Sequence, residues 1–158
     1  MREDWHFGKL ALVGALAGIV AGLVMLVFMA IVTAADGQGV WAVPKWISSA
    51  IYGDSWLGFN AADVFTGLAI HFVISLVLGG LFAMIAVPFA TEPRQLLFFG
   101  LVWGVIAYVV LSMLGMGALD ETMAQQVPLL PWFLAHLFFG LVVGYLVMAL
   151  RATAAATA

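Results

Sequence analysis

The chain of 158 residues contains no cysteine and very few charged residues. Without cysteine it can form neither disulfide bonds nor thiolate-ligated metal sites. Charged residues make up 8% of the sequence and hydrophobic residues 66%, whereas a typical soluble domain is about 25% charged. The formal net charge of -3 comes without a basic patch, so we expect no nucleic-acid partner. This composition indicates a protein of the lipid bilayer.

Four long runs of the sequence carry almost no charge. They cover residues 10–35, 64–88, 95–117 and 131–150. Each is close to the ~20 residues that a helix needs to cross a hydrocarbon core about 30 Å thick. Open strands are excluded because the amides at their edges would stay unsatisfied in lipid. We therefore predict an all-α integral membrane protein with four transmembrane helices in a single domain, residues 1–158.

The first run is longer than the apolar region of about 7–15 residues that a signal peptide carries. Glu3 and Asp4 also stand where such a leader would be basic. We expect a retained span, although Val32-Thr33-Ala34 fits a cleavage pattern and leaves removal of this segment open.

The basic residues predict the orientation, because lysine and arginine are enriched in cytoplasmic loops. Arg2, Lys9, Arg94 and Arg151 fall on one side of the four predicted spans, and only Lys45 falls on the other. We expect a multi-pass protein with its N- and C-termini in the cytoplasm and its two longer loops outside.

Two segments outside the predicted spans, the first outer loop and the C-terminal tail, have distinctive sequences. The segment WAVPKWISSAIYG in the loop places Pro44 in a first helical turn and Gly53 after a last one. We predict a short helix at about 43–52 on the outer interface. Asn60 and Asp63 then fit the N-cap and N3 positions of the second span. The alanine-rich tail, residues 152–158, is expected to be frayed.

Small residues recur along the spans at four-residue intervals, a pattern that lets two helices approach closely in lipid. The glycines that we expect to pack helices are Gly14, Gly18, Gly22, Gly67, Gly79, Gly100, Gly104, Gly140 and Gly144. Spans one and three are rich in glycine, and spans two and four each add one histidine. This alternation predicts two hairpins related as a parallel internal repeat, with a pseudo-twofold axis along the membrane normal.

His71 and His136 are the ionisable residues placed well inside the predicted spans. Both fall about 8–10 Å below the outer end of a span, at 1.5 Å per residue, and both lie on small-residue stripes. An ionisable side chain at such a depth is a candidate functional residue.

Four roles for these histidines are open at this stage. They could ligate heme b or another tetrapyrrole as two axial imidazoles, or titrate and bias a conformation. They could instead only pack, by a hydrogen bond to Ser75, Tyr108, Thr66 or a backbone carbonyl. With thioethers they could hold Cu(I). The methionines for this copper site would be Met25, Met29, Met113 and Met116.

No sequence motif of an enzyme is present, since P-loop, HExxH, GxSxG and dinucleotide-binding patterns are all missing. We expect no enzyme. The function that we favour is a membrane component that assembles as a homo-oligomer or in a larger membrane complex through its small-residue helix faces. The alternative is an electron-transfer protein whose cofactor is ligated by His71 and His136.

Residues 67–151 resemble the YagU-like family of four-helix bacterial inner-membrane proteins. The resemblance rests on GLAIHFVISLVLGGLFA, on a short proline-bearing turn, on a glycine-rich third span and on PWFLAHLFFGLVVGYL before an arginine. His71 and His136 fall where that group also carries histidines. The resemblance implies a location in the bacterial inner membrane, and it implies no particular activity.

Overall fold

A computed structural model describes residues 7–53, 59–112 and 126–156 of the chain, with side chains described up to residue 151. These residues form five helices and no strand, which confirms the all-α fold. The helices are α1 (Phe7–Ala35), α2 (Ala42–Tyr52), α3 (Ala61–Phe89), α4 (Gln95–Val109) and α7 (Leu129–Ala156).

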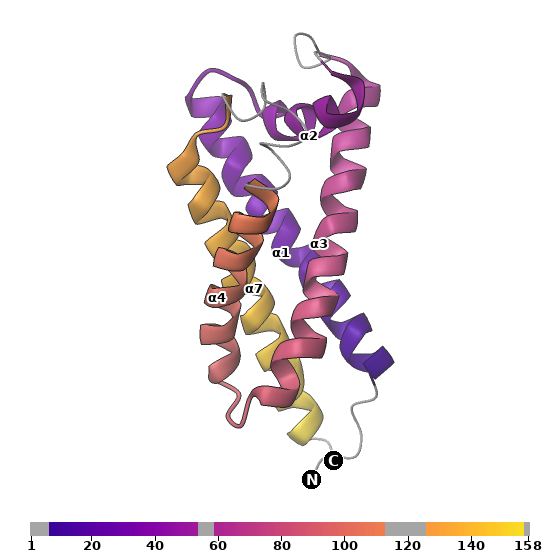
Figure 1. The fold of residues 1–158 in the computed structure, drawn as a ribbon, viewed down its shortest axis with the longest axis vertical. Coiled ribbons are helices and arrows are strands. Elements are labelled where there is room, and N and C mark those ends of the chain that lie inside the picture. The colour runs from indigo at the N-terminus through magenta and orange to yellow at the C-terminus, as the bar shows by residue number, and fades with distance from the viewer. Residues whose placement is uncertain (1–6, 54–58, 113–125, 157–158) are drawn as a thin grey trace.

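Four of the helices are long and apolar enough to cross a membrane, as predicted. They are α1, α3, α7 and α4, the last counted with a wider turn at 110–112 as Gln95–Ser112. The rest of the predicted third span, residues 113–117, lies outside the described residues. Figure 1 shows the start of α1 and the end of α7 at the same end of the bundle, with α2 lying across the other end.

The helices pack as two pairs, α1 with α3 and α4 with α7. In the first pair, a Cβ atom added at Gly18 would lie 3.0 Å from the Gly79 Cα and would overlap the Ser75 carbonyl oxygen. A Cβ atom at Gly14 would lie 2.9 Å from the Gly79 carbonyl carbon. Backbone therefore lies directly on backbone along this contact, and only glycine fits there.

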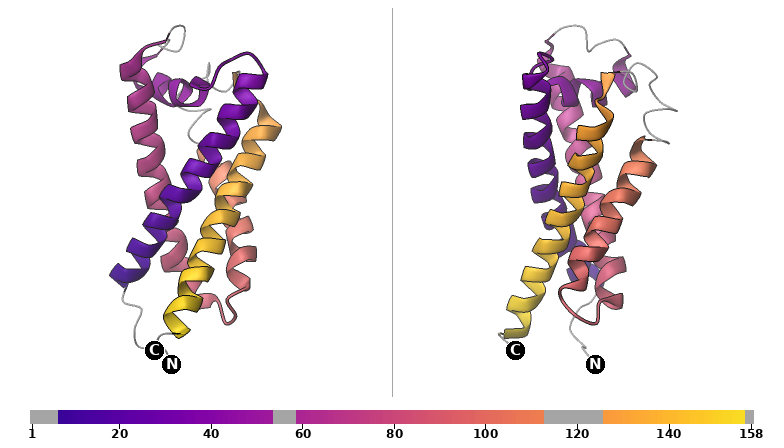
Figure 2. Two further views of the ribbon diagram at one scale, coloured as in Figure 1. Left: turned by 180° about the vertical axis from the view of Figure 1, so that it is seen from behind. Right: turned by 90° about the vertical axis from the view of Figure 1, so that its left-hand side faces the viewer.

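The second pair repeats this kind of contact with different residues. A Cβ atom at Gly100 would lie 3.2 Å from the Gly144 Cα, and one at Gly140 would lie 2.9 Å from the Gly104 Cα. The two helices of each pair run antiparallel (Figure 2). Glycine residues allow the close contact in both pairs. Each pair thus joins one glycine-rich helix, α1 or α4, to one histidine-bearing helix, α3 or α7. That the two pairs form an internal repeat stays a prediction.

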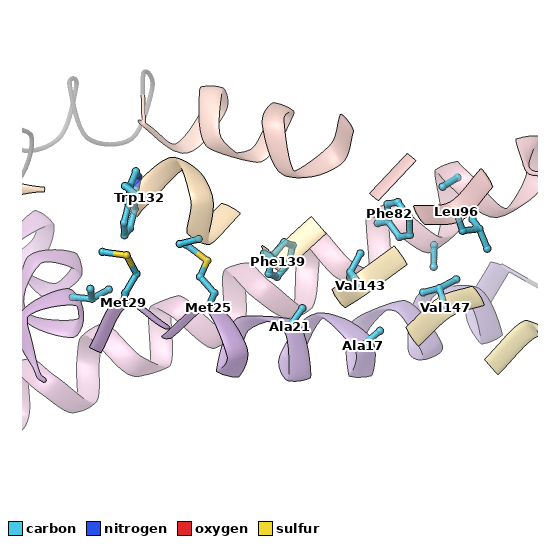
Figure 3. Packing of buried hydrophobic residues seen from close by; sticks show 14 of the residues in the cluster. Ala17, Ala21, Met25, Met29, Phe82, Leu96, Trp132, Phe139, Val143 and Val147 are labelled. Carbon is cyan, nitrogen blue, oxygen red and sulfur yellow. The ribbon is translucent and has the colours of Figure 1, made fainter. Parts of the chain in front are cut away.

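Helices α1 and α7 join the two pairs through larger side chains. Figure 3 shows α7 residues following one another along α1. The facing residues are Met29, Met25, Ala21 and Ala17 on α1, and Trp132, Phe139, Val143 and Val147 on α7. All are buried, and their spacing of four or seven residues keeps them on one face of each helix.

The short helix in the first loop confirms the predicted helix at about 43–52. It is packed more firmly than a helix that only rests on the interface, because Trp46 is buried and the Pro44 backbone sits against Gly67 of α3. Gly53 ends it with a positive φ of 66°, a conformation that favours glycine. Asn60 caps α3 by accepting a hydrogen bond from the Ala62 N–H at 2.9 Å.

Helix α7 continues to Ala156 and so includes part of the alanine-rich tail, whose fraying stays a prediction. Alanine has the highest helix propensity, so an alanine-rich segment extends a helix that is already nucleated. Arg151 ties this end to the turn between α3 and α4, because both terminal nitrogens of its guanidinium donate to the Ala90 carbonyl oxygen at 3.1 Å.

The glycine contacts generate a first prediction. Gly18→Leu should lower the apparent unfolding temperature in detergent, with a loss of about 1–3 kcal/mol from overpacking. Gly8→Leu is the matched control, because a Cβ atom at Gly8 meets no described atom within 4 Å. Thermal unfolding of both variants beside the parent protein is the measurement. Equal unfolding temperatures for the two variants would contradict this packing.

Candidate functional site

A cavity of about 410 Å³ lies between the two helix pairs near the end covered by α2. Both histidines line it, together with Ile74 of α3 and with Trp132 and Phe139 of α7. Helices α1, α2 and α4 also contribute to its wall. The structure therefore brings together the two residues that the sequence placed at one depth.

The cavity forms because α3 and α4 contact each other much less than the helices within each pair do. They meet near the turn that joins them, where the rings of Phe82 and Trp103 pack with centroids 6.1 Å apart. Toward the other end, Figure 1 shows α3 and α4 diverging while α2 lies across the top. The cavity at this end is lined by Met25 of α1 and by Ile47, Ala50 and Ile51 of α2, in addition to residues of α3 and α7.

His71 uses one ring nitrogen to bond a neighbouring helix. Its Nε2–H donates to the Gly22 carbonyl oxygen of α1 at 3.0 Å, and the side chain is 7% exposed. Gly22 allows this approach, because a Cβ atom there would lie 3.3 Å from the His71 Nε2. The packing role expected for a histidine, a hydrogen bond to a backbone carbonyl across a helix contact, is present at His71.

His136 makes a different bond, within its own helix. Its Nδ1–H donates to the Trp132 carbonyl oxygen at 2.8 Å, one turn earlier in α7. The side chain is 2% exposed, and its Nε2 is buried without a partner among the described residues. The Trp132 and Tyr108 rings pack edge-on against the imidazole, with centroids 5.0 and 5.7 Å away.

The packing of α4 also positions His136. Gly104 presses its backbone onto the His136 carbonyl group, so that a Cβ atom at Gly104 would lie 3.1 Å from that carbonyl carbon. The Trp132 indole N–H donates to the Ser112 hydroxyl oxygen at 3.0 Å, which fixes the ring beside the imidazole. The backbone and the nearest neighbour of His136 are both held in place.

The two imidazoles carry their protons on opposite nitrogens. A carbonyl oxygen can only accept, so the proton is on Nε2 in His71 and on Nδ1 in His136. A second proton would create a buried charge, which is costly without a partner. The ion pair of Arg94 with Glu92 is on the surface and involves neither ring. Both rings are therefore neutral, and His136 offers a lone pair at Nε2.

This arrangement fits a cofactor ligand at His136 better than at His71. A metal-ligating histidine almost always donates its other ring N–H to a carbonyl or carboxylate, as His136 does through Nδ1. The Nε2 of His71 is already bonded to Gly22, so this histidine would have to ligate through Nδ1 or release α1. The volume of about 410 Å³ lies toward the small end of the ~300–1,000 Å³ range of ligand pockets.

Two of the four candidate copper ligands, Met25 and Met29, belong to the described residues. Met25 lines the cavity, and Met29 is buried one turn further along α1, beside Trp132 (Figure 3). Met113 and Met116 lie outside the described residues. The described ranges contain no group of three or more His, Cys, Asp or Glu residues that could hold a metal ion.

Sequence reasoning missed the contribution of α2. Ile47, Ala50 and Ile51 of this helix line the cavity, although the sequence suggested only an interfacial helix. Gly67 was the available signal, since a glycine one turn before His71 lets the Pro44 backbone of α2 pack onto α3.

No protein-family model, curated protein or solved structure matches this chain.

The unequal hydrogen bonding of the histidines generates a second prediction. His71→Leu should lower stability by about 0.6–1.7 kcal/mol, because it removes a hydrogen bond between helices. His136→Leu should cost less than His71→Leu, because it removes a bond within one helix together with a buried nitrogen that has no partner.

Thermal unfolding of the two variants in the same detergent compares them directly. An equal or larger loss for His136→Leu would contradict an Nε2 that has no partner.

Proposed function

We propose that this protein is a non-enzymatic component of the bacterial inner membrane that binds a small membrane-soluble molecule between its helix pairs. The observation that carries the proposal is the cavity itself, which combines an apolar wall with two buried histidines. Holding an ionisable side chain inside a span is costly, and such residues usually mark a functional site. The cavity offers no recognised catalytic motif, and binding is the activity that its chemistry supports.

Charge and motifs support the location. Arg94 and Arg151 lie at the end of the bundle where α1 begins and α7 ends, and Lys45 lies at the other end on α2. Under the positive-inside rule this distribution favours cytoplasmic termini. Membership of the YagU-like family is also proposed, on the segments of α3 and α7 that carry His71 and His136.

Assembly with other chains remains part of the proposal, but through different surfaces. The glycine faces that we expected to join chains are used inside the chain, where they pack α1 on α3 and α4 on α7. A homo-oligomer or a larger membrane complex would instead use outward apolar side chains such as Val73, Val77 and Phe98.

A second candidate function is electron transfer with a bound heme or another tetrapyrrole. It is favoured by one observation, that both histidines line the same cavity. His136 would hold the iron through Nε2, and His71 would complete the pair through its remaining nitrogen. The group would supply one-electron chemistry, while Trp132 and Phe139 would exclude water from it.

The test purifies the protein from heme-replete cells in mild detergent and examines it in two ways. Oxidised and reduced visible spectra report a tetrapyrrole, and mass spectrometry of an organic extract reports any other bound molecule. Ile74→Trp fills the cavity, and Val73→Trp is its control because Val73 is 61% exposed on the outer face of α3.

We expect a molecule that is extracted from the parent and the Val73→Trp protein and is strongly depleted in the Ile74→Trp protein. A Soret band lost in a His71→Ala/His136→Ala variant would identify that molecule as a tetrapyrrole. Identical extracts from the parent and both tryptophan variants, together with a colourless protein, would overturn the proposal that the cavity binds a ligand.

A further inference from the structure

The two histidines of the cavity use different ring nitrogens in their hydrogen bonds, and this difference determines which polar group a ligand needs. His136 lines the cavity, and its Nε2 is buried with no partner among the described residues, while its Nδ1–H donates to the Trp132 carbonyl oxygen. A neutral imidazole in this tautomer can accept a hydrogen bond at Nε2 and cannot donate one there. The matching group on a ligand is a hydrogen-bond donor.

The side chains around this nitrogen favour a flat ring. Trp132 and Phe139 line the cavity beside His136, and Met25 adds a thioether from α1. Aromatic rings pack well on aromatic faces and edges, and sulfur makes favourable contacts with ring edges. Aliphatic side chains such as Ile70 and Ile74 complete the wall and suit an alkyl substituent.

The surroundings of the cavity suit a ligand that dissolves in the bilayer. Helices α1, α2, α3 and α7 all contribute apolar side chains to its wall. The neighbouring surface of α3 carries Val73 and Val77, which are 61% and 48% exposed. In a chain with four candidate membrane spans, exposed apolar side chains of this kind suit a hydrocarbon environment, which is also where an apolar ligand dissolves.

We propose that the cavity binds an alkyl-substituted aryl alcohol, of the phenol or hydroquinone class, whose hydroxyl donates to the Nε2 of His136. The inference rests on the proposed function and deepens it by naming the ligand class and the recognising atom. The aromatic ring lies beside Trp132 and Phe139, and the alkyl chain lies against Ile70 and Ile74. Binding involves no change of covalent bonds or oxidation state.

The experiment measures equilibrium binding of 4-octylphenol and 4-octyltoluene to the protein in nanodiscs, with empty nanodiscs as the background. The two probes share their shape, since a methyl group replaces the hydroxyl. We expect the parent protein to bind the phenol about tenfold more tightly, the ratio that one buried hydrogen bond supplies. In His136→Leu the ratio should fall to about one, while 4-octyltoluene binds about as it does to the parent protein.

Two controls separate this inference from the proposed function. Ile74→Trp should abolish binding of both probes, and Val73→Trp should leave both unchanged. Equal affinities of the two probes for the parent protein would overturn the role of His136 and leave the cavity as an apolar binding site. No saturable binding of either probe to the parent protein would count against both the cavity as a ligand site and this ligand class. A phenol preference that persists in His136→Leu would assign the hydroxyl to another acceptor and overturn the inference.

Discussion

Direct contact of backbone with backbone at glycine is the constraint on which the rest of the structure depends. In lipid there is no hydrophobic force between helices, so close approach must come from small residues. The Gly18–Gly79 contact in one pair and the Gly100–Gly144 contact in the other have no room for a Cβ atom. Each pair is therefore a tight unit, and the space that remains in the bundle lies between the pairs.

The cavity and the inequality of its histidines follow from that arrangement. Tight pairing brings the Gly22 carbonyl of α1 within hydrogen-bond distance of His71, so this imidazole is used for packing. In the other pair, α4 touches the backbone of His136 through Gly104 and leaves its Nε2 unbonded. Two histidines that look equivalent in the sequence thus differ in their bonding: His71 bonds a neighbouring helix, and His136 has a buried Nε2 without a partner among the described residues.

The sequence predicts the parts of this protein that depend on local pattern. Length and hydropathy predict the four spans, and Pro44 and Gly53 predict the short helix at about 43–52. Helical spacing puts both histidines at one depth. The partner of each imidazole depends instead on how helices from distant parts of the sequence cross. Gly22 lies 49 residues from His71, and its carbonyl has no sequence signal. The α2 wall of the cavity was missed for the same reason, because it arises from the Pro44–Gly67 contact.

The most direct test of this account is ¹⁵N NMR of the imidazole rings in the detergent-solubilised protein, with each histidine assigned by a His→Gln variant. Nitrogen shifts distinguish a protonated ring nitrogen from one that carries a lone pair. The account predicts two neutral rings of opposite tautomer, with the proton on Nε2 in His71 and on Nδ1 in His136. The same tautomer at both positions, or a doubly protonated His136 at neutral pH, would contradict it.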